Sequence, residues 1–138
     1  MAMTKFVLDS SAVLRMLDKE AGWERMAEIF ESHADGSCGV CISAVQWGEI
    51  AGAIRKRGGI SEQNRVMRKL DELQFEVKAV TWSEAIRAAE LRVDRGISYA
   101  DGFALELAMQ SPEHVLVTAD YDFKKAVDLV KTEFLPVK

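Results

Sequence analysis

The sequence predicts an α/β protein with a mostly parallel sheet, and three observations support that fold class. Short apolar segments alternate with longer amphipathic segments, which is typical of strands joined by crossover helices. Only two prolines interrupt the 138 residues, and no Ser/Gly-rich tract indicates a linker. Because 49% of the residues are apolar, the chain can bury one sizeable core. We therefore expect a single domain over residues 1–138, with five strands and about seven helices.

Each predicted strand is a short apolar run that ends at polar or turn-forming residues. The runs span residues 5–8, 38–42, 75–80, 115–118 and 133–135. The second run contains Cys38 and Cys41, the only cysteines, at a C-x-x-C spacing that also occurs in redox pairs and zinc sites. His33 and His114 are not at ligand spacing from them, and the segment has the pattern of a strand. We expect both cysteines to be buried in that strand as small apolar residues.

The predicted helices lie between the strands and are bounded by capping residues or glycines. They span residues 10–17, 23–33, 44–57, 61–73, 82–95, 99–110 and 122–127. Ser43 with Gln46, and Thr81 with Glu84, have the spacing of capping boxes at helix starts. Gly58-Gly59 predicts a break between the third and fourth helices.

The charge balance excludes two classes of protein. Lys and Arg number 18 against 22 Asp and Glu, a net charge of −4, which argues against a highly basic nucleic-acid-coating protein or a polybasic membrane-surface module. A metal-dependent nuclease stays compatible, because its active site concentrates carboxylates. No apolar run approaches the ~20 residues that span a bilayer, and the first residues lack a signal-peptide core. We expect a cytoplasmic protein with no membrane contact.

Two acids follow strands whose carboxyl ends can meet. Asp9 ends the first predicted strand and Asp120 follows the fourth. Ligands of doubly wound sheets bind beyond the carboxyl ends of the strands, so the two carboxylates face one crevice if these strands are neighbours. Taken singly, each acid also fits an ordinary helix cap or turn former.

Two further acids lie near helix starts. Asp101 precedes an apolar helix face, where an unpaired carboxylate is costly, although Ser98 and Asp101 also have the spacing of a capping box. Glu49 has mostly small or apolar neighbours at helical spacing, and a salt bridge to a nearby Arg is its alternative explanation. Four carboxylates at one end of the sheet would repel one another, and a divalent cation would relieve the repulsion. Ligation by oxygen alone favours Mg²⁺, with Mn²⁺ as a possible substitute.

Such a site suits phosphoryl chemistry, because a bound metal lowers the pKa of its water and stabilises charge on the phosphate. Ser10 and Thr118 could orient the water or a carboxylate ligand. Asp122 could extend the acidic rim, and it fits a helix start at least as well. A haloacid-dehalogenase-like phosphatase would need an acid where Ser11 stands, and no Gly-rich nucleotide-binding loop follows the first strand.

Four sequence blocks resemble the PIN-domain ribonucleases, and among them the VapC-like toxins of toxin-antitoxin pairs. The blocks are Val7-Leu8-Asp9-Ser10-Ser11-Ala12, Ile42-Ser43 followed by Glu49, Ile97-Ser98-Tyr99-Ala100-Asp101, and Val117-Thr118-Ala119-Asp120-Tyr121-Asp122-Phe123. They occur in order, with compatible spacing, over nearly the whole chain. The resemblance implies a PIN-like three-layer α/β/α fold and a magnesium site made by the four acids, with Ser10 and Thr118 in support. It also implies RNA cleavage and inhibition by a small antitoxin.

An RNA substrate would need cations near the site, and several basic clusters could contact its phosphates. They are Arg55-Lys56-Arg57, Arg65 with Arg68-Lys69, the segment 87–95, and Lys124-Lys125. The alternative for each cluster is an ordinary solvated helix face. Trp47 is expected to pack in the core, with contact to RNA or a partner as the alternative. The resemblance, and the apolar helices around Trp47 and Leu70, also favour a homodimer.

The predicted function is therefore a magnesium-dependent endoribonuclease, the toxin of a toxin-antitoxin pair, that cleaves RNA phosphodiesters with a metal-activated water. Two alternatives stay open: a non-catalytic PIN-like module that binds RNA or protein, and an α/β phosphatase. Binding of a divalent metal distinguishes the enzyme from the first alternative. Turnover of a generic phosphomonoester distinguishes it from the second.

Overall fold

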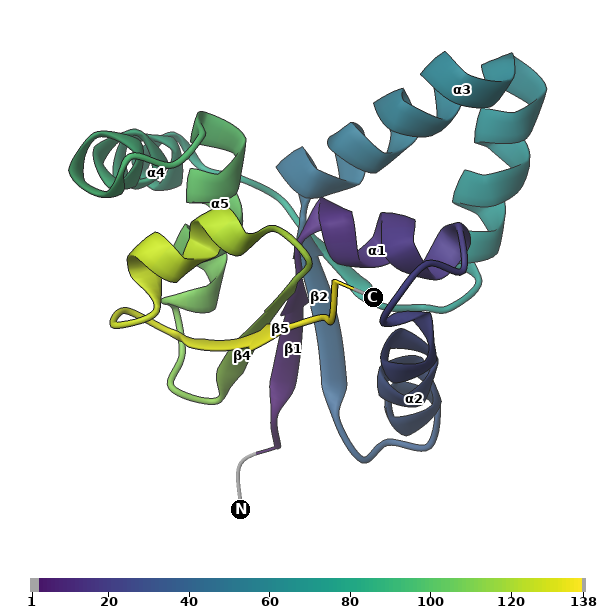
Figure 1. The fold of residues 1–138 in the computed structure, drawn as a ribbon, viewed down its shortest axis with the longest axis horizontal. Coiled ribbons are helices and arrows are strands. Elements are labelled where there is room, and N and C mark those ends of the chain that lie inside the picture. Colours follow the sequence, from purple (N-terminus) through teal and green to yellow (C-terminus); the bar gives the residue numbers. More distant parts are fainter. Residues whose placement is uncertain (1–2, 138) are drawn as a thin grey trace.

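Five short strands form one sheet in the order β3-β2-β1-β4-β5, in a computed structural model that describes residues 3–137 (Figure 1). The strands are β1 (Lys5–Leu8), β2 (Gly39–Ser43), β3 (Glu76–Lys78), β4 (His114–Thr118) and β5 (Lys131–Phe134). β1 is central and pairs with β2 on one side and with β4 on the other. Every pairing in the sheet is parallel. The predicted α/β class with a parallel sheet is confirmed.

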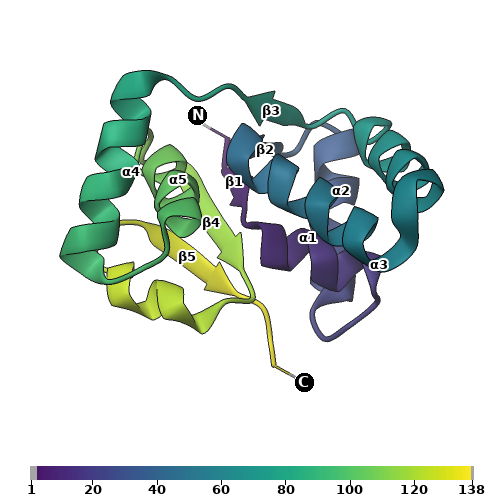
Figure 2. The same cartoon turned by 90° about the horizontal axis from the view of Figure 1, so that it is seen from above.

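Helices cover both faces of the sheet, as Figure 2 shows from above. They are α1 (Ser10–Leu17), α2 (Trp23–Ala34), α3 (Ala44–Asp71), α4 (Trp82–Arg95), α5 (Tyr99–Ala108) and the 3-10 helix η1 (Tyr121–Ala126). Strand side chains alternate between the faces, so Leu8 and Val117 pack with α1, α2 and α3, whereas Val7 and Leu116 pack with α5 and η1. The central strands are therefore buried on both faces, which explains their unbroken apolar sequences.

The predicted break at Gly58-Gly59 is a kink within one helix. Gly59 has φ 80° and ψ −170°, a backbone conformation that only glycine adopts at low cost, and helix continues on both sides of it. α3 therefore has a first arm, residues 44–58, and a second arm, residues 60–71, which run in different directions in Figure 1. Because the two predicted helices are one, residues 3–137 contain six helices where about seven were expected.

The two edge strands differ from their predicted boundaries. β3 covers only Glu76–Lys78, inside the predicted 75–80, and β5 begins at Lys131 rather than at residue 133. The register of β5 pairs Val115 with Lys131 and Thr118 with Phe134. Charged residues are common on edge strands, where they interrupt the apolar pattern by which a strand is recognised.

One of the two predicted capping boxes is present. At the start of α4, Thr81 Oγ1 accepts from Glu84 N at 3.2 Å, and Glu84 Oε1 accepts from Thr81 N at 2.8 Å. At the start of α3, Ser43 Oγ accepts from Val45 N at 3.1 Å, but Gln46 does not complete the box. The prediction for Gln46 is wrong because its side chain is buried and hydrogen-bonded to α5.

The remaining side chains singled out in the sequence pack inside the protein. Cys38 and Cys41 are both free and buried, as expected. Trp47 packs edge-on against Phe75, with ring centroids 5.6 Å apart, which confirms its role in the core. Leu70 is buried and Trp47 is half-buried, and both pack against the core rather than forming an exposed apolar surface. Over residues 3–137, no helix combines the length and apolar character needed to cross a membrane.

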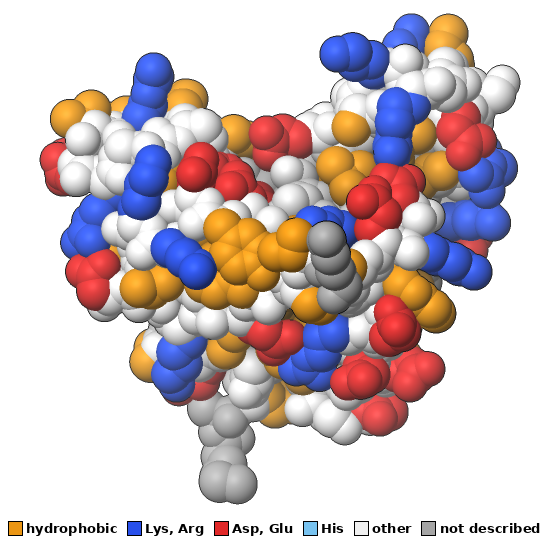
Figure 3. Space-filling model, viewed as in Figure 1, with side chains coloured by type: hydrophobic (Ala, Val, Ile, Leu, Met, Phe, Trp, Pro, Cys, Tyr) orange, Lys and Arg blue, Asp and Glu red, His pale blue; other side chains and the backbone are white. Residues whose placement is uncertain are grey.

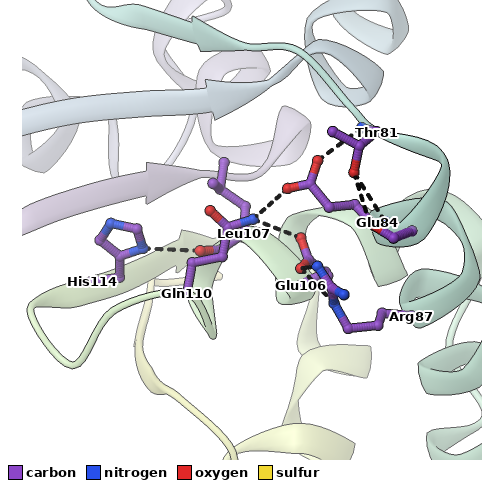
Figure 4. Close-up of polar contacts among 8 residues, drawn as sticks. Thr81, Glu84, Arg87, Glu106, Leu107, Gln110 and His114 are labelled. Carbon is purple, nitrogen blue, oxygen red and sulfur yellow. Dashed lines mark hydrogen bonds and ion pairs between the residues drawn. The ribbon is translucent and has the colours of Figure 1, made fainter.

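A polar network joins α4 to α5 (Figure 4). The buried Glu106 carboxylate accepts from Arg87 Nε at 3.0 Å and from Gln110 Nε2 at 2.9 Å. Gln110 Nε2 also donates to Glu84 Oε2 at 2.8 Å, which connects the network to the capping box of α4. A buried acid is thus compensated by a cation and an amide of its own chain.

Candidate acidic site at the carboxyl ends of the strands

The two central strands bring the first and the last of the predicted acids together. Leu8 of β1 is in register with Val117 of β4, and Asp9 N donates to Val117 O at 3.0 Å. Asp9 therefore lies directly beside Thr118, and Asp120 follows two residues later. This confirms that the two strands are neighbours. The strand order also runs in opposite directions from β1, through β2 and through β4, so Asp9 is at the switch point where ligands of such sheets bind.

Two hydroxyl groups hold one oxygen of Asp9. Asp9 Oδ2 accepts from Ser11 Oγ at 2.6 Å and from Thr118 Oγ1 at 2.9 Å. The residue is only 2% exposed, and its other oxygen, Oδ1, is buried without a hydrogen-bond partner among the described residues. Burial raises the pKa of Asp9, and the two hydroxyls oppose that shift. A carboxylate with one fixed oxygen and one unpaired oxygen is suited to binding a cation.

Ser11 is the residue of this site that the sequence reasoning missed. The hydroxyl of Ser11, and not that of Ser10, donates to Asp9, and Ser11 Oγ accepts from Ala119 N at 2.9 Å. One hydroxyl therefore ties the end of β1 to the segment that follows β4. The signal in the sequence was the position of Ser11 two residues after an acid at a helix start, where a hydroxyl can fold back onto that acid.

Glu49 lies in the second turn of α3 and is linked to α1. Ser10 Oγ donates to Glu49 Oε1 at 3.1 Å, so Ser10 does contact a carboxylate of the predicted set. Partial burial raises the pKa of Glu49; the Ser10 hydrogen bond opposes this shift and the Asp9 charge adds to it. The alternative of a salt bridge to Arg is not found, because no ion pair within residues 3–137 involves Glu49.

The surroundings of Asp101 also disfavour its charge. It lies in the first turn of α5, is 9% exposed, and donates from its backbone N to Ser98 Oγ at 3.0 Å. Ser98 therefore caps the helix, as the alternative explanation expected, but the reciprocal bond from Ser98 N to the Asp101 carboxylate, which would complete a capping box, is not found among the described residues. Burial, followed by the negative charges of the other three acids, raises the pKa of Asp101 to about 7. A capping role alone does not account for this environment.

Asp120 combines a turn-forming role with proximity to the other acids. Its backbone N donates to Thr118 Oγ1 at 2.9 Å, and its Oδ1 accepts from Asp122 N at 2.9 Å, where η1 begins. Its charge contributes to the raised pKa of both Asp9 and Asp101. Asp122 is exposed and lies in the first turn of the 3-10 helix, which agrees with the simpler of its two interpretations.

We refer to Asp9, Glu49, Asp101 and Asp120 as the acidic cluster. No ion pair within residues 3–137 involves any of them. Figure 3 shows acidic side chains in the notch between the two helical lobes. The four interact through their charges, yet in the part of the chain described here no three His, Cys, Asp or Glu side chains form a ready metal-binding group. Like charges without a counterion repel one another, so this spacing is expected. The donors themselves fit a hard divalent cation, because all are carboxylates and Asp9 Oδ1 has no other partner.

Comparison with known proteins identifies the family. The sequence matches the PIN domain over residues 6–129, and the chain therefore belongs to the PIN domain family. PIN domains are generally nucleases that use divalent metal ions. A comparison with curated proteins finds no match.

Several solved structures share the fold. DNA-bound VapBC from Salmonella typhimurium matches with a TM-score of 0.73 at 20% identity, covering 96% of this chain and 98% of that one. VapBC2 from Rickettsia felis, bound to a promoter DNA fragment, matches with a TM-score of 0.69 at 16% identity, covering 96% and 100%. VapBC-1 from nontypeable Haemophilus influenzae matches with a TM-score of 0.64 at 14% identity, covering 95% and 98%. These likenesses confirm the PIN-like fold.

Proposed function

We propose that this chain is a magnesium-dependent endoribonuclease, the VapC-like toxin of a toxin-antitoxin pair. One observation carries the proposal: the acidic cluster gathers four carboxylates at the switch point of the sheet without a cation of the chain beside them. Membership of the PIN family supports nuclease chemistry, and the likeness to VapBC structures supports the toxin class. The enzyme would be one PIN domain over residues 1–138 that acts in the cytoplasm, where the two free cysteines stay reduced.

The residues of the site have distinct proposed roles. The acidic cluster would hold Mg²⁺, or Mn²⁺ in its place, and the bound ion would supply an activated water and stabilise charge on the phosphate. Thr118 and Ser11 fix Asp9 Oδ2, which leaves Oδ1 available. Ser10 orients Glu49. Attack by water leaves a 5′ phosphate and does not use the 2′-hydroxyl of the RNA.

The RNA backbone would be held by Lys and Arg side chains that form no ion pair with acids of the chain. Four members of the predicted basic clusters form ion pairs with acids of the chain: Arg57, Arg65, Arg87 and Arg95. Within residues 3–137, Lys56, Arg68 and Lys69 are exposed and form no ion pair. We assign phosphate contacts to these three residues because they lie in α3, the helix that also carries Glu49 of the acidic cluster.

The antitoxin would be a protein partner. The similar structures from Salmonella typhimurium, Rickettsia felis and Haemophilus influenzae are of VapBC, which supports a cognate partner for this chain. A groove between α1 and the two arms of α3 offers it a place, with Leu17, Ile54 and Val66 as apolar lining. Its charged lining comprises two ion pairs, Arg57–Asp18 and Arg65–Glu62, and Lys69, which forms no ion pair among the described residues. Such a groove fits an antitoxin segment that combines apolar and acidic side chains.

A homodimer is also part of the proposal, and α4 offers the surface. Trp82 is 80% exposed and Val93 is 81% exposed, and Ile86 and Ala89 are exposed on the same face of the helix. The helix carries three acids and three arginines, so two copies meet without net repulsion. Antiparallel pairing would place the bulky Trp82 of each copy near the small Gly96 of the other.

Sedimentation of the purified chain tests the dimer proposal. We expect the wild type to sediment as a dimer and the Trp82→Arg variant as a monomer; a monomeric wild type would contradict this.

Cleavage of RNA by the purified chain tests the nuclease proposal. The assay compares Mg²⁺ with EDTA, and the wild type with Asp9→Asn and Asp101→Asn variants shown to be folded by circular dichroism. We expect cleavage only with metal and about a 100-fold loss or more in both variants, because each loses a carboxylate ligand. Glu24→Gln, on the exposed side of α2, is the matched control and keeps full activity. Metal-independent cleavage, or full activity in both site variants, would refute the proposal.

Two further measurements separate the alternatives. A non-catalytic PIN-like binding module would bind no Mg²⁺ in calorimetry and cleave nothing. An α/β phosphatase would turn over a generic phosphomonoester, which the proposed nuclease does not. Sequencing the cleavage ends of RNA isolated after induced expression would then identify the target RNA.

A further inference from the structure

Gln46 connects two of the helices that carry the acidic cluster. It lies in the first turn of α3, one turn before Glu49, and its side chain is fully buried. Gln46 Nε2 donates to the backbone carbonyl of Ala100, which directly precedes Asp101 in α5. One side-chain hydrogen bond therefore joins the helix of Glu49 to the helix turn of Asp101.

The other end of the same side chain has no partner. Gln46 Oε1 is buried and accepts no hydrogen bond among the described residues. Leaving such an acceptor unsatisfied costs about 1–3 kcal/mol, whereas an apolar side chain of the same length would avoid that cost. Three buried side-chain polar atoms among the described residues lack a hydrogen-bond partner, and two of them are Asp9 Oδ1 and Gln46 Oε1. One belongs to the acidic cluster, and the other belongs to the residue that contacts the turn of Asp101.

We propose that Gln46 is a positioning residue that sets the separation between Glu49 and Asp101, and that its free oxygen accepts a hydrogen bond from water entering with a divalent cation. This inference rests on the proposed function, because it assigns Gln46 a role toward the same metal site. The separation matters because the two acids come from different helices and share no strand pairing that would fix it. A residue that only fills the core would need neither the amide donor nor the unsatisfied acceptor.

The experiment compares Gln46→Met with Gln63→Met. Methionine is close to glutamine in length and removes both polar atoms. Gln63 is the matched control, because its Nε2 also donates to a backbone carbonyl, that of Ala51 at 3.0 Å, but both partners lie in α3 and neither belongs to the acidic cluster. Calorimetric titration with Mn²⁺ and thermal unfolding are measured for the wild type and both variants.

We expect Gln46→Met to unfold at the same or a higher temperature than the wild type and to bind Mn²⁺ about 10-fold more weakly, as loss of a supporting group does at metal sites. RNA cleavage should fall mainly in kcat, with little change in KM. Gln63→Met should match the wild type in Mn²⁺ affinity. Wild-type Mn²⁺ affinity in Gln46→Met would overturn the inference while leaving the proposed function intact, whereas a wild type that binds no Mn²⁺ would overturn both.

A measurement on the wild type covers the case in which Gln46→Met does not fold. The side-chain amide signals of Gln46 and Gln63 are followed by NMR during titration with Mg²⁺. We expect the Gln46 signals to shift and the Gln63 signals to stay in place. A Gln46 amide that does not respond to bound Mg²⁺ would overturn its role.

Discussion

Helix α5 carries two buried acids whose surroundings are opposite. Glu106, in its second half, accepts from the Arg87 guanidinium and from the Gln110 amide. Asp101, in its first turn, has no cation beside it, and burial together with three other carboxylates raises its pKa. The same helix therefore contains one compensated carboxylate and one uncompensated carboxylate.

This difference shows that the fold can place a cation beside a buried acid, although it places none beside Asp101. The chain supplies a cation for Glu106 on that very helix, so it is able to neutralise a buried acid where structure alone requires it. At the carboxyl ends of the central strands, the chain gathers four acids and places no Lys or Arg beside them. Protonation of Asp101, whose pKa is about 7, relieves part of that repulsion, whereas a divalent cation from outside the chain would relieve it with all four acids charged.

The largest expected effect comes from removing the compensation of Glu106. Arg87→Met should lower the free energy of unfolding by about 3 kcal/mol, because it leaves a buried carboxylate without its cation. Urea unfolding measures the loss. Arg92→Met, on the same helix and without an ion pair among the described residues, is the control and should show no resolvable change. Equal losses in both variants would mean that the Arg87–Glu106 pair contributes nothing specific.

A somewhat smaller change in the free energy of unfolding is expected when Mg²⁺ is added to neutralise the charges of the acidic cluster. Mg²⁺ at about 30 times its dissociation constant should raise the free energy of unfolding by about 2 kcal/mol, since it binds only the folded chain. Arg87→Met should keep this increment and Asp101→Asn should lose most of it. The comparison fails if Mg²⁺ stabilises Asp101→Asn as much as the wild type.

The pH dependence of the metal-free protein gives a third effect, of about 1–2 kcal/mol. The pKa of Asp101 is about 7 in the folded chain against 3.8 as its ordinary value, so the folded state binds the proton more tightly between these values. In EDTA, the Asp101 contribution therefore increases stability as the pH falls from 8 to 5.5. Asp101→Asn should be more stable than the wild type at pH 8 and equal to it near pH 5.5. Parallel stability curves for the two proteins would contradict the assignment.

The smallest effects distinguish the two serines that follow Asp9. Ser11→Ala should lower the free energy of unfolding by about 1 kcal/mol, because it removes a hydrogen bond to a buried carboxylate. Ser10→Ala should lower it by only about 0.3 kcal/mol, since its partner Glu49 is much less buried than Asp9. Thermal unfolding of both variants in EDTA gives the comparison, and the reverse order of effects would show that Asp9 does not depend on Ser11.

Features that depend on neighbours in the sequence were largely predictable. The Thr81–Glu84 capping box and the alternation of strands and helices follow from local spacing. The proximity of Asp9 and Asp120 was also predictable from the sequence, because the carboxyl ends of neighbouring parallel strands lie at the same end of a sheet. The kink at Gly59 was recognised as an interruption, but local sequence does not determine whether the helix resumes after one residue.

Features that depend on contacts between distant segments could not be predicted. Gln46 has the spacing of a capping residue, and only the packing of α3 against α5 turns its amide toward Ala100. In the local sequence, Ser11 is indistinguishable from other serines in a first helical turn, because its hydrogen bond with Ala119 N depends on the pairing of β1 with β4. The Arg87–Glu106 pair likewise requires α4 and α5 to be packed together, which no periodicity in either helix specifies.

The bonds that close the acidic cluster join opposite ends of the chain, which has a consequence for its synthesis. Thr118 donates to Asp9, and Ala119 donates to Ser11, across more than a hundred residues. Contacts of such long sequence separation form late and slowly in folding. During translation, the cluster cannot assemble until β4 has left the ribosome and inserted beside β1. The proposed nuclease would therefore stay inactive for most of its own synthesis, and the proposed antitoxin would have that interval in which to be made first.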